Sequence, residues 1–590
     1  MAKAEATVEE LVSKIERGEL RLPEMQRRYV WRSTRVRDLL DSLYRGYPSG
    51  AILIWETDEP VPEQAFAVGQ QANPYAKTQL LLDGQQRLTS LSAVIRGEPV
   101  QVNGRVRPIE LLFNLEHPDQ LSVITEVDDN STDAADEPVD VNDNGEDPSD
   151  DEADASEDEL QRRFDRMTFV VATRKLELLP QWVKVSEVFK TDSDAPFLQQ
   201  AGVSGFDDDR YQKYSQRLAR LRGIRKYVYR MDVLERSLSY DEVTEIFVRV
   251  NSLGAKLRSS DLALAQITAK WRGSLQTFQS YQADCTKIGF ELDLGIFLKN
   301  LVAHATSQSR FLTVAGLKLD QLRSGWDAGC QGFDFALNVL RSNTGITSPA
   351  LLASPFLLIS LGFYGAQRRY TLSPEEAAGL VRWVLLANAK GRYSRGSSET
   401  LLDQDLKIIR DGGGTAELLD RLRTQVGRLD IAPEELEGRS QRSALFKTMF
   451  LAFQQAGARD WQTQLAIALS HVGSAHQLQF HHIFPKALLK KNGYSIRESD
   501  DIANLAFIGG KANRRISDKS PALYIPELIA TNGDQPFTSQ CIPTDPALLS
   551  PERYRDFLSA RRQLIAERLN AFLTVAAIPV GAAECTQTEF

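Results

Sequence analysis

The histidines of this sequence are gathered in one short stretch, which points to a shared chemical task. The chain has only six histidines, and four of them lie within 12 residues: His471, His476, His481 and His482. Histidine can accept a proton near neutral pH or ligate a metal ion. Neighbouring side chains of a strand point to opposite faces, so one ring of the last pair could hold an ion while the other takes a proton. For His471 and His476 we expect ordinary helix or loop roles.

Two asparagines and several basic residues follow the histidine pair. Asn504 begins a short apolar run, and Asn513 lies nine residues later in a basic segment with helical spacing. We therefore expect strands at residues 477–483 and 504–508 and a helix within residues 510–519. Phosphate binding needs positive charge, and four nearby side chains can supply it or can simply be solvated: Lys486, Lys511, Arg514 and Arg515.

This order of residues resembles the ββα-metal HNH nuclease motif in the C-terminal domain of GmrSD restriction enzymes. The likeness rests on HHIFP at residues 481–485, IANL at 502–505 and KANR at 511–514. It implies that His482 is the general base, which deprotonates a water that attacks a phosphodiester. It also implies that His481 and Asn513 hold a divalent ion. Asn504 would orient the His482 loop from the second strand.

The implied metal is Mg²⁺, with Mn²⁺ as an alternative. The residue before the base is often acidic in such motifs, and a carboxylate suits Mg²⁺ better than the imidazole of His481 does. Ni²⁺ and Zn²⁺ therefore stay open as well. A purely structural ββα element is the other interpretation, and the same chemistry could also cut RNA.

A second polar group lies at an early strand-to-helix turn. An apolar strand at 79–82 runs into Asp83, Gly84, Gln85, Gln86 and Arg87, and the apolar residues that follow have helical spacing. Free backbone N–H groups and the helix dipole attract an anion at such a turn, Gly84 allows close approach, and Arg87 can add a two-pronged contact. Taken alone, these residues fit a capped turn with a surface arginine at least as well.

Three further segments make the signal more specific. PxxQRxYVW at residues 23–31, GYPSGAILIW at 46–55, LLLDGQQRLTSL at 80–91 and IFVRVNSLGAKL at 246–257 together resemble the N-terminal domain of the GmrSD family of modification-dependent restriction enzymes. The resemblance covers about residues 7–265. It implies a ParB/sulfiredoxin-like fold, binding and hydrolysis of GTP or another NTP at the DGQQR turn, and sensing of modified DNA. The flanking motifs contribute a possible pocket lined by Gln26, Arg27, Arg249 and Asn251.

The net charge of −9 argues against a nucleic-acid partner only at first sight. Residues 128–159 contain 16 Asp or Glu and no Lys or Arg, so the rest of the chain has 70 basic and 63 acidic side chains, or +7. The acidic run has almost no large apolar residues, which predicts a disordered insertion. The remaining body is basic enough for DNA. A further hypothesis is that the acidic run competes with DNA for the basic surface of the remaining chain.

The apolar pattern predicts an α+β multidomain protein. We expect strands at 51–55, 79–82, 109–115, 169–171 and 182–185, helices at 34–44 and from about 211 to 262, and a capping box formed by Thr7 and Glu10. The expected domains are residues 1–262, a helical connector at 263–470 and a nuclease domain at 471–590 with a helix at about 551–572. The acidic run would interrupt the first domain.

We expect a cytoplasmic protein without a membrane partner. The N-terminus lacks the apolar stretch of a signal peptide, and the most apolar segment, residues 351–363, is shorter than the roughly 20 residues that cross a bilayer. The four cysteines lie far apart with no CxxC pair, so neither a zinc site nor a disulfide framework is indicated. In the helical connector, the acids near Arg392 (Glu399, Asp403 and Asp405) could form a second metal site, but helix capping and surface charge explain them better.

Together these observations predict a modification-dependent DNA endonuclease of bacterial defence against phage. NTP binding or hydrolysis in the first domain would regulate metal-dependent cleavage at His482. The alternative is a DNA-binding regulator or adaptor that does not cleave and whose HNH element is structural. The sequence leaves the oligomeric state open, and a homo-oligomer is compatible with it.

Overall fold

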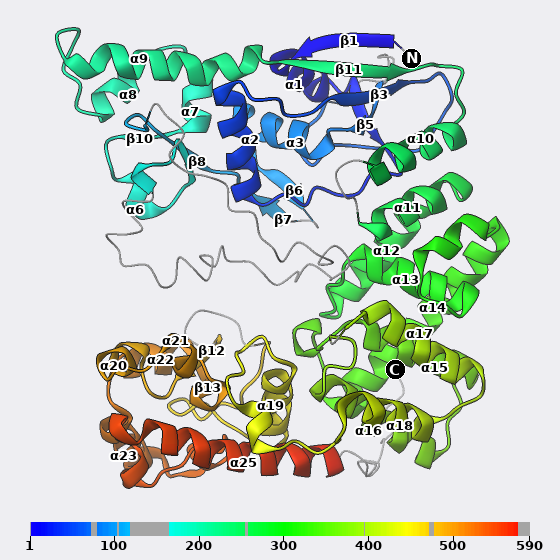
Figure 1. Ribbon diagram of the computed structural model, residues 1–590, viewed down its shortest axis with the longest axis vertical. Helices are drawn as coiled ribbons and strands as arrows, with labels where there is room; N and C mark the ends of the chain where they lie inside the picture. Colours follow the sequence, from blue (N-terminus) through cyan, green and yellow to red (C-terminus); the bar gives the residue numbers. More distant parts are fainter. Residues whose placement is uncertain are drawn as a thin grey trace, which may run out of the picture. The chain divides into compact units, whose positions relative to one another are not determined.

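The computed structural model describes residues 2–71, 79–102, 105–118, 164–253, 258–394, 396–470 and 477–575 (Figure 1). The acidic run 128–159, His471 and His476 lie outside these residues. The chain divides into two compact units: residues 1–278 with 314–319, and residues 279–313 with 320–590. Each unit is described by itself. The fold is mixed α and β, as the sequence predicts.

A six-stranded sheet forms the centre of the first unit. In spatial order its strands are β1 (Ala2–Thr7), β11 (Val228–Leu234), β3 (Ile52–Glu56), β5 (Gln79–Asp83), β2 (Leu20–Pro23) and β4 (Glu63–Gln64). The pairs β11–β3 and β5–β2 are parallel and the other pairs are antiparallel. Because β5 lies between β3 and β2, its end, which carries Asp83, belongs to an inner strand of the sheet.

Both faces of this sheet are covered by helices, because its strands are apolar on both sides. Leu81 of β5 packs into the larger core with α1 (Val8–Glu16), α2 (Ser33–Arg45) and α3 (Gln85–Arg96). Leu80 and Leu82 point the other way, toward α10 (Tyr240–Leu253) and α11 (Ser259–Lys270). This alternation follows from the two-residue period of a strand. As a result, Leu81 faces one core of the first unit, and Leu80 and Leu82 face the other.

Smaller elements complete the first unit. A three-stranded antiparallel sheet has the order β10 (Trp182–Lys184), β8 (Leu111–Asn114) and β9 (Phe169–Val171), and β6 (Val100–Val102) pairs with β7 (Arg105–Arg107). The remaining helices are α6 (Arg174–Glu177), α7 (Val185–Lys190), α8 (Ala195–Gln200), α9 (Asp209–Arg222) and η1 (Gly223–Lys226). The predicted strands at 109–115, 169–171 and 182–185 are therefore confirmed to within a few residues.

Two segments of the first unit differ from the sequence prediction. The capping box of Thr7 and Glu10 is confirmed, with both reciprocal bonds present, but residues 2–7 before it form a strand. The expected helical stretch from 211 to 262 is wrong at residues 228–234, which form β11. Met231 and Leu234 of this strand are buried among residues of β1 and β3. The apolar spacing of residues 228–234 fits a helix or a strand. Pairing of this segment with β1 on one edge and with β3 on the other makes it a strand.

The chain from residue 274 to 455 is helical, as predicted. Its elements are α12 (Ser274–Lys287), α13 (Leu294–Thr306), η2 (Phe311–Gly316), α14 (Leu319–Val339), η3 (Leu340–Thr344), η4 (Pro349–Leu351), α15 (Phe356–Gln367), α16 (Pro374–Ala389), α17 (Ser398–Arg410), α18 (Thr415–Val426), η5 (Pro433–Leu436) and α19 (Ala444–Gln455). The apolar α15 is buried along most of its length. None of the helices in the described ranges has the length and hydrophobicity to cross a bilayer.

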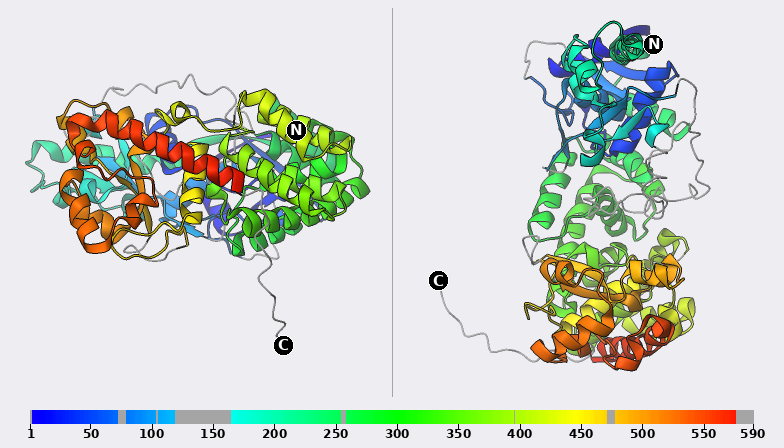
Figure 2. Two further views of the ribbon diagram at one scale, coloured as in Figure 1. Left: turned by 90° about the horizontal axis from the view of Figure 1, so that it is seen from below. Right: turned by 90° about the vertical axis from the view of Figure 1, so that its left-hand side faces the viewer.

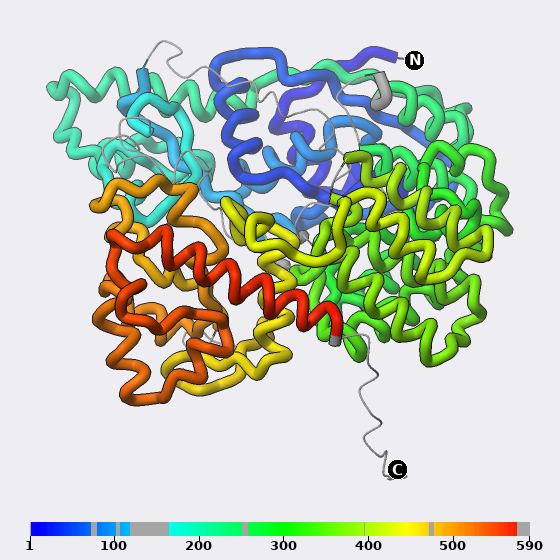
Figure 3. The backbone as a smooth tube through the Cα atoms, turned by 60° about the horizontal axis from the view of Figure 1, so that its bottom comes forward, coloured from blue at the N-terminus to red at the C-terminus, as the bar shows by residue number. Residues whose placement is uncertain are grey.

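The last part of the chain contains a pair of short antiparallel strands and several helices. Its elements are β12 (Leu478–His482), α20 (Lys486–Lys491), α21 (Ile496–Ser499), η6 (Ile502–Asn504), β13 (Leu505–Gly509), α22 (Gly510–Ile516), α23 (Pro521–Asn532), α24 (Gln535–Thr538), η7 (Pro546–Leu548), η8 (Pro551–Arg553) and α25 (Tyr554–Val575). The long α25 packs against α16, α19 and η6 (Figures 2 and 3). It thereby supports the turn that precedes β13.

We predict that Gly84→Ala destabilises the first unit by about 1–3 kcal/mol, because residue 84 has φ +102° and its Cβ would lie 2.5 Å from Cδ1 of Ile52. Urea unfolding followed by tryptophan fluorescence measures the effect. Gly205→Ala is the control, since its Cβ would meet open space and its φ is not positive. Equal unfolding midpoints for the two variants would contradict the prediction.

Candidate functional site

The histidine pair lies at the end of the first strand of a strand, strand, helix unit. β12 pairs antiparallel with β13, so that His481 is opposite Ala506 and His482 is opposite Leu505. Residue 510 begins α22 directly after β13, and Asn513 is at its middle. The order of elements predicted from the sequence is therefore present. The pleat of β12 sends the two imidazoles to opposite sides.

His481 points into the interior and meets Asn513. Its side chain is almost fully buried, and Nδ1 lies 2.7 Å from the amide oxygen Oδ1 of Asn513. The Asn513 amide nitrogen donates to Oε1 of Gln479 at 2.7 Å, which fixes the orientation of the amide. The rings of Trp461 and Tyr524 contact the imidazole edge to face. Burial lowers the pKa of His481 to about 4, so the ring is neutral at physiological pH.

His482 lies on the other side of the strand and is paired with an acid. Its Nε2 is 2.9 Å from Oδ1 of Asp500, and Lys486 Nζ is 2.8 Å from the same oxygen. Burial lowers the pKa of His482, and the Asp500 contact partly opposes that shift. Partial burial tends to raise the pKa of Asp500, but hydrogen bonds from Lys486 and His482 outweigh it and lower the pKa. A neutral imidazole thus faces an ionised carboxylate.

Asn504 fixes the chain on both sides of this pair. Its side-chain oxygen accepts a bond from the Phe484 backbone N–H at 2.8 Å, and its amide nitrogen donates to the carbonyls of Phe484 and Ser499. Phe484 lies two residues after His482, and Ser499 directly precedes Asp500. The fully buried Arg561 of α25 donates to the carbonyl of Ala503 at 2.8 Å and so holds the same turn. One amide therefore connects the segments that carry His482 and Asp500.

The His481 and Asn513 side chains suit a divalent ion as a partial ligand set. Ligand distances of about 2.1 Å place neighbouring donors of one ion about 3 Å apart, which is close to the 2.7 Å between these two atoms. Among the described residues, the buried Nε2 of His481 has no hydrogen-bond partner, so it could take up the ring proton if Nδ1 became a ligand. Within the described ranges no group of three His, Cys, Asp or Glu side chains has a metal-binding arrangement. Water or substrate oxygens would have to complete the coordination.

The DGQQR turn of the first unit joins β5 to α3, as predicted, and its two glutamines hold a neighbouring segment. Gln85 donates to the carbonyl of Arg27 at 2.8 Å. The Gln86 side-chain oxygen accepts bonds from the backbone N–H groups of Val30 and Trp31 at 2.9 and 3.3 Å. Both glutamines are buried. Their described contacts are with backbone, so they position residues 27–31 beside the turn.

Arg87 is engaged in a similar way. Its guanidinium donates to the carbonyls of Ser49 and Ala51 and forms an ion pair with Asp83 at 3.0 Å. It also lies 5.9 Å from the ring centre of Tyr229. Arg87 is largely buried, whereas the Asp83 side chain is 43% exposed. The arginine thus fastens the GYPSG loop to the turn, and the acid is the more accessible group.

The structure brings part of the predicted flanking pocket to this turn. Gln26 is buried and donates to the carbonyls of Leu81 and Leu82 at the end of β5. Arg27 forms an ion pair of 2.8 Å with Asp261 of α11. Arg249 is 73% exposed and pairs with Glu245 one turn earlier in α10. The Asn251 side chain lies outside the described residues.

Two acids beside the candidate sites were not singled out by the sequence pattern. Asp500 accepts bonds from His482 and Lys486, and Asp261 pairs with Arg27. Asp500 lies 18 residues after His482 in a polar segment, and nothing in its spacing distinguishes it from a solvated acid. Asp261 follows the GAKL motif by four residues, and its position in the first turn of α11 fits an ordinary helix start. Only the tertiary structure identifies these partners.

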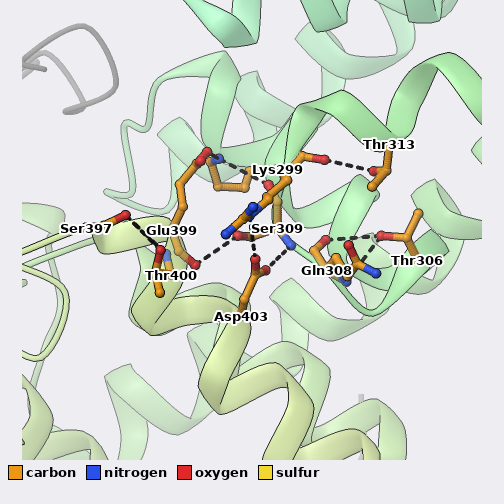
Figure 4. A network of polar contacts seen from close by, with 10 residues as sticks. Lys299, Thr306, Gln308, Ser309, Thr313, Ser397, Glu399, Thr400 and Asp403 are labelled. Atoms are coloured by element: carbon orange, nitrogen blue, oxygen red, sulfur yellow. Dashed lines mark hydrogen bonds and ion pairs between the residues drawn. The ribbon is translucent and has the colours of Figure 1, made fainter.

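The acids near Arg392 form structural ion pairs. Arg392 and Asp405 are fully buried and bond through two nitrogens at 3.0 and 2.8 Å. Glu399 of α17 pairs with the buried Lys299 of α13, and Asp403 accepts the backbone N–H of Ser309 (Figure 4). These contacts fasten α17 to the segment around residue 309. The expectation of helix capping and surface charge is therefore wrong for Asp405, which forms a buried ion pair with Arg392.

The first half of the chain matches a known domain. Residues 8–268 fit the family model described as the GmrSD restriction endonuclease, N-terminal domain. Residues 8–268 are thus similar to the N-terminal domain of GmrSD restriction endonucleases. This match indicates a restriction-endonuclease type of function, with DNA as the partner. It covers the DGQQR turn and all three flanking motifs.

One curated relative extends the similarity beyond this domain. An uncharacterized protein of Methanocaldococcus jannaschii is 24% identical over 565 residues, which cover 88% of this chain and 86% of the relative. The aligned length is more than twice that of the GmrSD N-terminal domain. The similarity therefore includes much of the second unit.

We predict that Asn504→Ala destabilises the second unit by about 2–4 kcal/mol, because three buried backbone groups lose their partner. Thermal unfolding followed by circular dichroism measures the loss. Asn492→Ala is the matched control: Asn492 is exposed and donates to one carbonyl at the end of α20. A change for Asn504→Ala as small as that for Asn492→Ala would show that these bonds do not hold the turn.

Proposed function

We propose that the protein is a metal-dependent DNA endonuclease of the GmrSD type, in which an NTP bound by the first unit regulates cleavage by the second. The observation that carries the nuclease assignment is the arrangement of His481, His482 and Asn513 on β12 and α22, with a 2.7 Å contact between His481 and Asn513. The GmrSD N-terminal domain in the same chain supports it. Foreign or modified DNA is the proposed substrate, in defence against phage.

In this proposal His482 is the general base. Its neutral imidazole takes a proton from the water that attacks the phosphodiester, and Asn504 keeps the following segment in place. His481 and Asn513 would hold the divalent ion. When bound, that ion supplies positive charge that stabilises the phosphate oxygens as negative charge develops on them. Lys511, which is exposed on α22, contributes further positive charge for the DNA backbone.

The first unit is proposed to bind an NTP at the DGQQR turn. Gly84 is in the left-handed conformation, and α3 begins directly after it. The start of a helix attracts phosphate oxygens, and the accessible Asp83 and the partly buried Arg27 lie in the segments that meet there. The glutamines and Arg87 are proposed to act by holding this surface in shape. GTP is one candidate nucleotide among the NTPs.

We expect His482→Ala to lower the rate of DNA cleavage by about 100-fold or more, since general bases contribute roughly 10²–10⁴-fold to such reactions. The measurement is plasmid or phage-DNA cleavage with Mg²⁺ or Mn²⁺, over modified and unmodified DNA and with and without each NTP. Gln477→Ala, an exposed residue just before β12, is the control and should cleave at the wild-type rate.

The same assay separates the nuclease from a DNA-binding regulator. A nuclease loses cleavage in chelator, whereas a regulator binds DNA with salt-sensitive affinity and cleaves nothing under any of these conditions. Wild-type cleavage by His482→Ala would remove the nuclease assignment from this site. Cleavage of RNA in preference to DNA would keep the site and change the substrate.

For the first unit we expect Arg87→Ala to weaken NTP binding at least tenfold, because the Ser49–Ala51 backbone and Asp83 lose their common partner. Titration with a fluorescent NTP measures the affinity, and NTP turnover is followed in parallel. Arg236→Ala, which removes an exposed ion pair with Glu56, should bind NTP normally. Unchanged NTP affinity and turnover in a folded Arg87→Ala protein would exclude this turn as the nucleotide site.

A further inference from the structure

Asp500 lies next to His482, although the proposed reaction gives it no role. His482 is the last residue of β12, and Asp500 directly follows α21. The His482 Nε2 and the Asp500 Oδ1 atoms are 2.9 Å apart. A carboxylate can only accept here, so Nε2 carries the ring proton. The lone pair is then on Nδ1, on the other side of the ring from Asp500.

The backbone around Asp500 is firmly fixed. The carbonyl of Ser499 accepts a bond from Asn504, and the carbonyl of Glu498 accepts one from the Tyr554 hydroxyl at 2.7 Å. The next residue, Asp501, accepts the backbone N–H of Gly438 at 2.8 Å and pairs with Arg562 at 2.6 Å. Asp500 therefore has little freedom to leave His482, and the carboxylate can set the angle of the imidazole.

Lys486 completes the arrangement from the solvent side. Its ammonium group contacts the same Asp500 oxygen as His482 does, at 2.8 Å, and its side chain is 53% exposed. The cation favours the ionised form of Asp500. The three residues come from the end of β12, the start of α20 and the end of α21.

We propose that Asp500 is a positioning residue for the base of the nuclease centre, an inference that rests on the proposed function. Asp500 fixes the tautomer and the angle of His482. In the step itself, Nδ1 of His482 takes a proton from water as the water oxygen bonds to phosphorus. One phosphorus–oxygen ester bond breaks, and the departing oxygen takes a proton from solvent. The Asp500 carboxylate stabilises the imidazolium that forms and stays ionised throughout.

The test compares Asp500→Ala, Asp500→Glu and His482→Ala in the full-length protein. We expect Asp500→Ala to lower kcat for DNA cleavage by about 10- to 1,000-fold, with KM, DNA affinity and Mn²⁺ affinity within twofold of wild type. Asp500→Glu should recover part of the lost kcat, because it restores an acceptor. Mn²⁺ affinity is measured by calorimetry without DNA. Asp534→Ala, an exposed acid whose side chain caps no helix, should cleave at the wild-type rate.

Three results would overturn the positioning role. Wild-type kcat in Asp500→Ala, alongside an inactive His482→Ala, would show that the base needs no orientation from the acid. Weakened Mn²⁺ binding in Asp500→Ala would make Asp500 a metal ligand instead. Equal loss in Asp500→Ala and Asp500→Glu, with a lowered unfolding midpoint for both, would make it a structural residue.

Should Asp500→Ala fail to fold, Asp500→Asn, which keeps the shape without the charge, should show the same selective loss of kcat. Cleavage by His482→Ala would defeat the proposed function itself and is distinct from these results.

Discussion

Both candidate sites depend on hydrogen bonds between side-chain amides and backbone that is buried or partly buried. Each site is partly built from irregular chain, and buried backbone N–H and C=O groups of such chain need partners that regular structure would otherwise supply. Gln86 satisfies Val30 and Trp31 in the first unit, and Asn504 satisfies both backbone groups of Phe484 in the second. An amide is suited to this task because it donates and accepts at once. Each unsatisfied group would cost about 1–3 kcal/mol, so these few bonds decide whether the loops hold their shape.

This constraint determines how the polar residues of each site divide their tasks. Gln85, Gln86 and Arg87 spend their described bonds on backbone and on Asp83, so they shape the surface at the start of α3. In the second unit, Asn504 has the same supporting role. The residues with chemically available atoms are a smaller set. In the proposed nuclease centre they are the imidazole of His482 and the facing pair of His481 and Asn513.

The local sequence pattern predicts most helices and strands, but it does not predict which residues the fold brings into contact. Apolar spacing predicts β5, β9, β12 and α3 because each has a clear period or a marked end, such as Gly84. It fails at 228–234, where pairing with β1 and β3 decides the structure. The histidine cluster and Asn513 could be found because histidine is rare and the spacing is characteristic. Asp500 and Asp261 could not, because an acid in a polar segment acquires meaning only through the residue that the fold places beside it.

The burial of His481 also bears on the proposed metal. A carboxylate at this position would be removed from water between Trp461 and Tyr524, which costs several kcal/mol unless an ion is already bound. The neutral imidazole avoids that cost, so the centre can fold before any ion arrives. The same choice weakens the preference for Mg²⁺, because imidazole nitrogen suits Zn²⁺, Ni²⁺ and similar ions better than it suits Mg²⁺. If the proposed ion binds here, water and substrate oxygens would supply the rest of its coordination.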